Sequence, residues 1–216
     1  MLKIDLHTHS IASPDGSLKM ADYKKMLRGG LDVIAITDHN TISFGKKVQA
    51  ELGQNIIVGE EITTLKGEII GLFLKHVVRP GLSPLETVKA IHNQDGLVYL
   101  PHPFETVRKG MKAEVLQEII DHVDIIEVFN GRAVFQNRSA IARQWAKKYK
   151  KARAASSDAH GLYGWGRTYT LVKEVPKYDT LIDLLSTSDV NLSERRANLL
   201  GVCYPKFNRL RKAIGF

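Results

Sequence analysis

Histidine and acidic side chains follow several apolar segments of strand length in this sequence. The segment 2–6 leads directly into His7-Thr8-His9. Side chains alternate along a strand, so His7 and His9 point to the same side and can hold one metal ion. The same association of a strand end with imidazole or carboxylate recurs at Asp38-His39, Glu60-Glu61, His102, Glu127 to Asn130, and Asp158 to His160.

The donor types in this set favour a hydrolytic metal site. Imidazole and carboxylate without thiolate suit zinc, manganese or iron, and one carboxylate can bridge two ions so that their combined charge activates a water molecule. Five of the eight histidines lie at strand ends, whereas His76, His92 and His122 lie outside the pattern and are expected to be structural or solvated. A surface strand can carry two polar residues by chance, but the joint pattern predicts a multinuclear metal centre.

Apolar segments of strand length alternate with segments of helical period, which is typical of βα units and a mostly parallel sheet. In a closed parallel barrel the C-terminal ends of the strands meet on one face, which would bring the polar side chains together. A hairpin rather than a crossover is expected over 61–75, around Lys66-Gly67. The expected strands are 2–6, 33–37, 56–63, 68–74, 97–100, 125–129, 154–156 and 169–172. The expected helices are 20–28, 44–52, 83–94, 112–122, 134–151 and 178–185.

The composition is that of an ordinary globular protein. The 216 residues are 44% apolar and 25% charged, which fits one sizeable domain. With no apolar run of membrane-spanning length and no stretch resembling a signal peptide before the first strand, we expect neither a membrane-spanning nor a secreted protein. The single Cys203 excludes an intramolecular disulfide and a multi-thiolate zinc site. A cytoplasmic location is therefore expected.

Much of the positive charge lies at the C-terminal end. The chain has a formal charge of +8, and from Asn191 onward six basic residues stand against the single acid Glu194. We therefore expect a barrel over residues 1–190 and a basic tail over 191–216, packed on the barrel or extending from it. Such a tail can attract phosphate-bearing ligands or nucleic acid, although a solvated basic surface is the commoner explanation.

Taken together, the strand-end motifs closely resemble the polymerase and histidinol phosphatase (PHP) family of metallophosphoesterases. The resemblance covers residues 1 to about 175, and it is specific because all the motifs occur in the family's order. It implies an α/β fold, a distorted seven-stranded TIM-like (β/α) barrel, with up to three divalent ions at the C-terminal end of the strands. The motifs are His7-x-His9, Thr37-Asp38-His39, Gly59-x-Glu61-Ile62, His102-Pro103, Glu127-x-x-Asn130 and Ser157-Asp158-Ala159-His160.

The resemblance also implies a ligand set for two or three ions of zinc, manganese or iron. The first ion would be held by His7, His9, Glu61 and Asp158. The second ion would be held by Glu61, His102 and, at a position where many members have histidine, Glu68. The third ion would be held by His39, His160 and Asp15, the last from Ser13-Pro14-Asp15-Gly16, where the family often has Ser-Asp-Gly. A carboxylate at Glu68 suits manganese at least as well as zinc, while the alternative for Glu68 is a solvated acid at a strand edge.

Four further polar residues are candidates for contact with substrate. Arg132, beyond the fifth predicted βα strand, and Arg167, in a loop near the same rim, can grip phosphate oxygens, because a guanidinium offers forked donors. Asn130 and Glu127 can face the substrate, orient ligands or close the barrel. Exposed arginines are common, so an ordinary surface role for each arginine stays open.

The expected reaction is hydrolysis of a phosphate ester by a metal-bound hydroxide, with Asp158, His160 and Arg132 as catalytic residues. His160, Asp15 or a metal-bound water can protonate the leaving group. The positive charge favours a phosphorylated small molecule, a nucleotide, a nucleoside bisphosphate or an oligonucleotide end, and histidinol phosphate stays open. Two alternatives remain: an amidohydrolase-like C–N hydrolase, although no lysine lies at a strand end, and a non-catalytic module whose tail binds nucleic acid or a partner.

Overall fold

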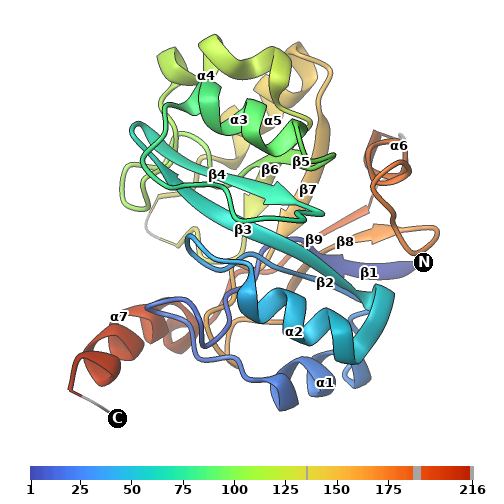
Figure 1. Ribbon diagram of the computed structural model, residues 1–216, viewed down its shortest axis with the longest axis vertical. Helices are drawn as coiled ribbons and strands as arrows, with labels where there is room; N and C mark the ends of the chain where they lie inside the picture. The colour runs from blue at the N-terminus through green and yellow to red at the C-terminus, as the bar shows by residue number, and fades with distance from the viewer. Residues whose placement is uncertain (135, 187–190, 215–216) are drawn as a thin grey trace.

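The computed structural model describes residues 1–134, 136–186 and 191–214, and this part of the chain forms a mixed α/β fold around one sheet (Figure 1). The order of the strands across the sheet is β7-β6-β5-β4-β3-β2-β1-β8-β9. The strands are β1 (Leu2–Asp5), β2 (Val33–Ile36), β3 (Ile56–Thr64), β4 (Gly67–Leu72), β5 (Leu97–Leu100), β6 (Ile125–Asn130), β7 (Ala152–Ser156), β8 (Thr168–Val172) and β9 (Asn191–Glu194). The helices are α1 (Met20–Arg28), α2 (Ser43–Leu52), α3 (Pro84–His92), α4 (Ala113–Ile119), α5 (Ser139–Lys148), α6 (Leu181–Ser186) and α7 (Leu199–Ala213).

The sheet curls into a nearly closed barrel. Strands β1, β2 and β3 are parallel, as are β5, β6 and β7, and β4 joins the two groups by antiparallel pairing. Beyond the strand ends, Thr8 forms a parallel bridge with Ala159, and the His9 N–H donates to the Ala159 carbonyl at 2.9 Å. The segments that follow β1 and β7 are therefore joined at the C-terminal end of the parallel strands.

The expected seven-stranded barrel is wrong in its strand count. The described chain holds nine strands, and β8 and β9 add an antiparallel ribbon beside β1. The hairpin expected over 61–75 is confirmed, because β3 and β4 pair antiparallel and Thr64 lies opposite Gly67. Strand β9 was not expected, since its few residues lie in the basic tail, where apolar alternation is weak.

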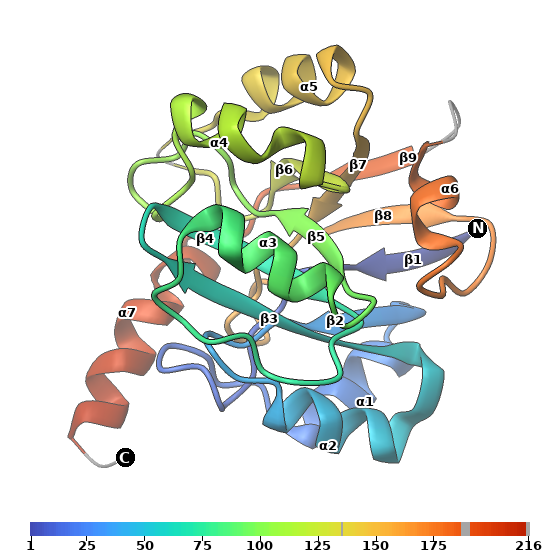
Figure 2. The ribbon, with the colours of Figure 1, turned by 45° about the horizontal axis from the view of Figure 1, so that its top comes forward.

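Helices cover both flanks of the barrel. In Figure 1, α3, α4 and α5 lie on one side and α1 and α2 on the other, and α6 and α7 lie at different ends. Figure 2 shows β1 running away from the N-terminus toward the side where α7 lies. The buried residues under α3, α4 and α5 form one apolar cluster, and those under α1 and α2 form another. Helices α1 to α5 therefore pack on the outside of the barrel and leave the C-terminal ends of the parallel strands uncovered.

Local sequence explains where individual helices begin. Helix α3 begins with a capping box: the Ser83 Oγ accepts from the Glu86 N–H at 3.3 Å, while a Glu86 carboxylate oxygen accepts from the Ser83 N–H at 2.9 Å. Helix α5 begins at Ser139 rather than at residue 134, because the Asn137 side chain accepts from the Ser139 N–H and ends the preceding loop. Phe135, within that expected helix, lies outside the described residues.

The basic tail, 191–216, contains two regular elements and ends at 215–216 outside the described residues. Strand β9 pairs with β8, and helix α7 follows it after a short connection. Helix α7 was not predicted, because Pro205 lies inside it and proline normally interrupts a helix. Among the described residues, no helix is both long and apolar enough to cross a membrane.

Candidate metal centre

The C-terminal ends of the parallel strands converge on one polar cluster. His7 and His9 follow β1, and His39 follows β2. Glu61 lies in β3 and Glu68 in β4, whereas His102 follows β5. Asp158 and His160 follow β7, and Asp15 comes from the long loop between β1 and α1. The structure therefore brings together all nine residues that the sequence proposes as metal ligands, in the part of the barrel where they are expected.

Glu61 lies at the centre of this cluster. Its Oε1 is 3.1 Å from the His102 Nε2, and its Oε2 is 3.1 Å from the His39 Nδ1 and 3.3 Å from the His9 Nε2. Burial favours the protonated acid, but the surrounding histidines outweigh it and hold the pKa of Glu61 well below its usual range. The residue is therefore an ionised carboxylate whose two oxygens face different histidines.

Asp158, in the segment that follows β7, faces His7 and His9, which follow β1. Its Oδ1 lies 3.5 Å from the His7 Nε2 and 3.4 Å from the His9 Nε2. Burial alone would raise the pKa of Asp158, but Arg132 and His7 hold it well below the usual range. The backbone of Asp158 is in the left-handed region, with φ 53°, a strained conformation for a non-glycine residue that is common at functional sites.

A second set of contacts directs the two imidazoles after β1. The His7 Nδ1 is 3.2 Å from the Glu127 Oε1, and the His9 Nδ1 is 3.0 Å from the Ser13 Oγ. The two Nε2 atoms lie 3.0 Å apart and face the acids. Hydrogen bonds at Nδ1 fix the ring orientation and leave Nε2 to ligate a metal.

Asp15, His39 and His160 form a neighbouring group. The Asp15 Oδ1 is 3.5 Å from the His39 Nε2 and 3.4 Å from the His160 Nε2. Both Asp15 Oδ1 and His160 Nε2 are buried without a hydrogen-bond partner in the described structure. Unsatisfied buried acceptors are costly in a folded protein, so these two atoms are suited to bind a cation.

The donor set fits divalent metal ions. Four groups of three residues each place one ligand atom per residue within 4.8 Å of the others: His9, His39 and His160; His7, His102 and Asp158; His7, His9 and Glu61; and Glu61, Glu68 and His102. All donors are imidazole nitrogens or carboxylate oxygens, which suit zinc, manganese or iron. The chain therefore has clusters that can bind metal ions.

Glu68 is buried rather than solvated. It is 6% exposed, and its strand β4 lies between β3 and β5, so the alternative of an exposed strand edge is wrong. Burial, together with the nearby Glu61 charge, raises the pKa of Glu68 to about 9, against the opposing effect of Lys109. In the metal-free protein Glu68 thus carries a proton at neutral pH, and a cation must displace that proton to use the carboxylate.

This proton gives a testable pH dependence. The folded pKa is raised, so the folded chain binds more protons than the unfolded chain between about pH 4.5 and 9. The contribution of Glu68 to stability is therefore present at low pH and is lost as the pH rises through that window, by up to about 1.4 kcal/mol per pH unit. We expect Glu68→Gln to raise the melting temperature of the metal-free protein at pH 8 and to leave it nearly unchanged at pH 4.5. An equal effect at both pH values, measured by calorimetry, would contradict the protonated state.

Glu127 and Asn130 connect several of the candidate ligands through hydrogen bonds. Besides its contact with His7, Glu127 accepts from the backbone N–H of His102 at 2.6 Å and from the Asn130 Nδ2 at 2.9 Å. The Asn130 amide also lies 3.3 Å from the Asp158 carboxylate. Asn130 is buried and does not line the main cavity, so its position favours orientation of the ligands over contact with substrate.

Arg132 and Arg167, the two arginines proposed from the sequence, differ in their position relative to the cavity. Arg132 lines the cavity, and its Nη1 donates to the Asp158 carboxylate at 3.2 Å and lies 3.2 Å from the His160 Nδ1. Arg167 is exposed and is absent from the cavity lining, so the structure does not bring it to the site. Arg108, which sequence reasoning missed, donates to Asp158 at 2.7 Å and to the Asn130 Oδ1 at 2.6 Å. The only sequence signal for Arg108 is its place in the loop that follows His102.

A cavity of about 480 Å³ opens over the cluster. Its floor carries metal-competent residues, among them Glu61, His102 and Asp158. Lys109 and two basic residues of α7, Lys206 and Arg209, contribute to its walls. A cavity of this size suits a small-molecule substrate, and its walls combine candidate metal ligands with positive charge.

Comparison with known proteins places this arrangement in a family. The PHP domain family matches residues 5–200. The chain belongs to the PHP domain family. The resemblance drawn from the strand-end motifs is thereby confirmed. Two relatives from Methanocaldococcus jannaschii are the uncharacterized proteins MJ1587 and MJ0417. MJ1587 is 36% identical over 155 residues, covering 63% of this chain and 88% of the relative. MJ0417 is 35% identical over 215 residues, covering 92% of this chain and 85% of the relative.

Solved structures share the PHP fold of this chain at low sequence identity. A two-domain protein from Bacteroides vulgatus, described as containing a predicted PHP-like metal-dependent phosphoesterase, has a TM-score of 0.71 and 19% identity over 96% of this chain and 69% of its own. A lesion-specific endonuclease from Pyrococcus furiosus has a TM-score of 0.61 and 16% identity, over 88% and 57%. An amidohydrolase from Chromobacterium violaceum has a TM-score of 0.57 and 16% identity, over 73% and 87%. At these identities the likeness concerns the fold.

Proposed function

We propose that this PHP protein is a metal-dependent phosphoesterase that hydrolyses a phosphate ester. The observation that carries the proposal is the convergence of nine candidate imidazole and carboxylate ligands, seven of which line one cavity together with Arg132. The family membership, and the names of structural neighbours that include a predicted metal-dependent phosphoesterase and an endonuclease, support a metal-dependent hydrolase.

The proposed ligand assignment follows the contacts in the cluster. The first ion would be held by His7, His9, Glu61 and Asp158, the second by Glu61, His102 and Glu68, and the third by Asp15, His39 and His160. When bound, two or three divalent ions of zinc, manganese or iron supply positive charge that lowers the pKa of water and neutralises developing charge on phosphoryl oxygens. Glu61 is proposed to bridge two ions, since its two oxygens face different histidines.

Arg132 is proposed to position the phosphoryl group. Its Nε is buried and has no hydrogen-bond partner in the described structure, while its Nη1 is held by Asp158. A guanidinium fixed at one end in this way keeps a donor for a phosphate oxygen. Arg108 is anchored by Glu105, Asn130 and Asp158, and its proposed role is to hold the Asp158 carboxylate.

The state of His160 favours a ligand over a proton donor. Burial and the charge of Arg132 lower the pKa of His160, despite the opposing effect of Asp15 and Asp158. The imidazole is then neutral near pH 7 and offers a lone pair to a metal ion. We therefore assign His160 to the reaction through its ligand position. Burial alone would raise the pKa of Asp15, but His160 and the neighbouring histidines hold it below its usual range, so Asp15 carries no proton and the leaving oxygen takes its proton from solvent.

The basic walls of the cavity favour a multiply charged substrate. Lys109, Lys206 and Arg209 lie around the same space as the ligand cluster. We propose a nucleotide, a nucleoside bisphosphate, an oligonucleotide end or a small phosphomonoester, because each offers a second polar or anionic group to this wall. C–N hydrolysis, as the name of the Chromobacterium violaceum neighbour would suggest, is a separate outcome of the same assays.

The two arginines named from the sequence provide a matched test. Arg132→Met keeps much of the side-chain length but removes the guanidinium, and we expect kcat/KM for a phosphomonoester to fall about 10²-fold. Arg167→Met is the control, because Arg167 is exposed and away from the cavity lining, and its kcat/KM should stay within about twofold of the wild type. Equal losses in the two variants, measured under saturating metal, would contradict the assignment of Arg132.

A further inference from the structure

Helix α7 touches two of the candidate third-ion ligands through one buried amide. Asn208 is 2% exposed, and its Nδ2 donates to the backbone carbonyl of Asp15 at 2.7 Å and to that of His160 at 3.1 Å. These two residues come from loops at different strand ends. A single side chain therefore links the backbone of both residues, and the His160 carbonyl also accepts from the Ser17 N–H at 3.0 Å and the Ser17 Oγ at 2.9 Å.

The next residue of α7 fixes the direction of the Asp15 carboxylate. The Arg209 Nη2 donates to the Asp15 Oδ2 at 2.7 Å, which leaves Oδ1 facing His39 and His160. The Oδ1 atom is the one that is buried without a hydrogen-bond partner. One oxygen of the Asp15 carboxylate therefore binds Arg209, and the other faces the two imidazoles.

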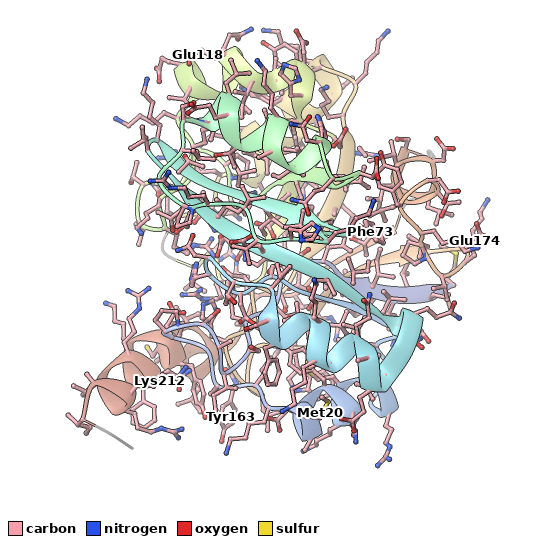
Figure 3. All side chains as sticks on the ribbon, in the orientation of Figure 1. Met20, Phe73, Glu118, Tyr163, Glu174 and Lys212 are labelled. Atoms are coloured by element: carbon pink, nitrogen blue, oxygen red, sulfur yellow. The ribbon has the colours of Figure 1, made fainter. Side chains whose placement is uncertain are left out.

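Other contacts hold the same loops against α7. The Lys212 Nζ donates to the carbonyls of Ile11 at 2.7 Å and Ser13 at 2.5 Å. A Cβ on Gly161 would lie 2.4 Å from the Tyr204 ring, so only glycine allows this packing next to His160. Figure 1 shows α7 beside the blue loop that follows β1, and Figure 3 labels Lys212 on that helix.

We propose that α7 is the positioning element of the third metal site, with Asn208 and Arg209 as its positioning residues. The inference rests on the proposed metal centre. Asn208 sets the spacing of Asp15 and His160, and Arg209 turns the free carboxylate oxygen of Asp15 toward the histidines. Part of the positive charge of the basic tail therefore binds a candidate metal ligand of the same chain, Asp15, rather than a nucleic acid.

The test measures metal binding rather than turnover. Asn208→Leu keeps side-chain bulk and removes the donor, and Arg209→Met removes the ion pair at a side chain that is 65% exposed. We expect each variant to bind one ion about 10- to 100-fold more weakly than the wild type, with the affinity for the other ions unchanged. Asn208→Leu is also expected to lower the melting temperature, because it leaves the Asp15 carbonyl without this donor, whereas Arg209→Met, at an exposed side chain, is not. Manganese content per chain, measured by elemental analysis at a series of free metal concentrations, gives this result. Arg209→Lys should restore part of the loss.

The control lies on the opposite face of the same helix. Leu210 is 64% exposed and makes none of these contacts, so Leu210→Ala should bind metal as the wild type does. Unchanged manganese content and affinity in both Asn208→Leu and Arg209→Met would overturn the role of α7 and leave the proposed function intact. Loss of every ion in either variant would overturn the proposal that α7 acts on the third site alone. A wild type that binds no manganese or zinc would overturn the proposed metal centre itself, and the role of α7 with it.

Discussion

Replacing Asp158 with alanine is expected to abolish turnover, with a loss in kcat of at least about 10³-fold, or about 4 kcal/mol of transition-state stabilisation. The Asp158 Oδ1 lies within 3.5 Å of the His7 and His9 nitrogens, so it shares the first proposed ion with them. Its other oxygen accepts from Arg108 and Arg132, which removes the anchor of the proposed phosphate-binding arginine as well. Steady-state kinetics with added manganese or zinc measures the loss.

A second variant separates catalysis from folding in this test. Asp158→Ala leaves the partly buried guanidinium groups of Arg108 and Arg132 without their shared acid, which costs stability. Asp158→Asn keeps the shape and one acceptor oxygen while removing the charge, and it should show a native circular dichroism spectrum with the same loss of turnover. Near-normal activity in a folded Asp158→Ala protein would contradict the proposed mechanism.

Replacing Glu61 with alanine is expected to remove the metal centre as a unit. Glu61 contacts imidazoles that belong to all three proposed ions, and its pKa is held well below the usual range, so it supplies charge at any physiological pH. We expect at least two ions per chain to be lost and kcat to fall to the background of the assay. Elemental analysis of the purified variant, followed by the phosphatase assay, measures both effects.

The preceding residue offers a matched control for Glu61. Glu60 lies in the same strand, is fully buried and accepts from the backbone N–H of Val78 at 2.8 Å, away from the histidines. Burial raises the pKa of Glu60 to about 7, so at pH 7 about half of the Glu60 side chains are already protonated, and glutamine removes less charge there than at Glu61. Glu60→Gln should therefore keep its metal. Full metal content in Glu61→Ala would contradict the bridging role.

The sequence predicts the ligand cluster because its signal is local. His7-x-His9 at a strand end needs only the alternation of side chains, and the barrel then brings distant strand ends together. The eight expected strands lie within β1 to β8 or overlap them, and the Ser83 capping box is confirmed in α3. The strand count was wrong because β9 is a short edge strand within a basic segment, where no apolar alternation marks it.

Other parts of the site depend on contacts between distant residues. Arg108 reaches Asp158 only because the loop after β5 folds back over the strand ends, and nothing in its sequence neighbourhood indicates that path. Arg167 is also an arginine in a loop, yet it is exposed and does not line the cavity. The segment that forms helix α7 contains Pro205 and several charged residues, so its sequence favours a charged tail. In the structure its Asn208 is buried and donates to the carbonyls of Asp15 and His160. Residue type and spacing do not distinguish these cases.

Phosphate release from a substrate panel tests the central claim most directly. The panel holds phosphomonoesters, 3′,5′-bisphosphates, histidinol phosphate and an activated phosphodiester, each with manganese or zinc and each with a chelator. The proposed function predicts release that requires metal, is abolished by the chelator and is restored by adding metal back, with the preferred member naming the substrate group. No release from any member by a protein shown to hold metal would contradict the phosphoesterase assignment and favour C–N hydrolysis, whereas no release and no bound metal would favour a non-catalytic module.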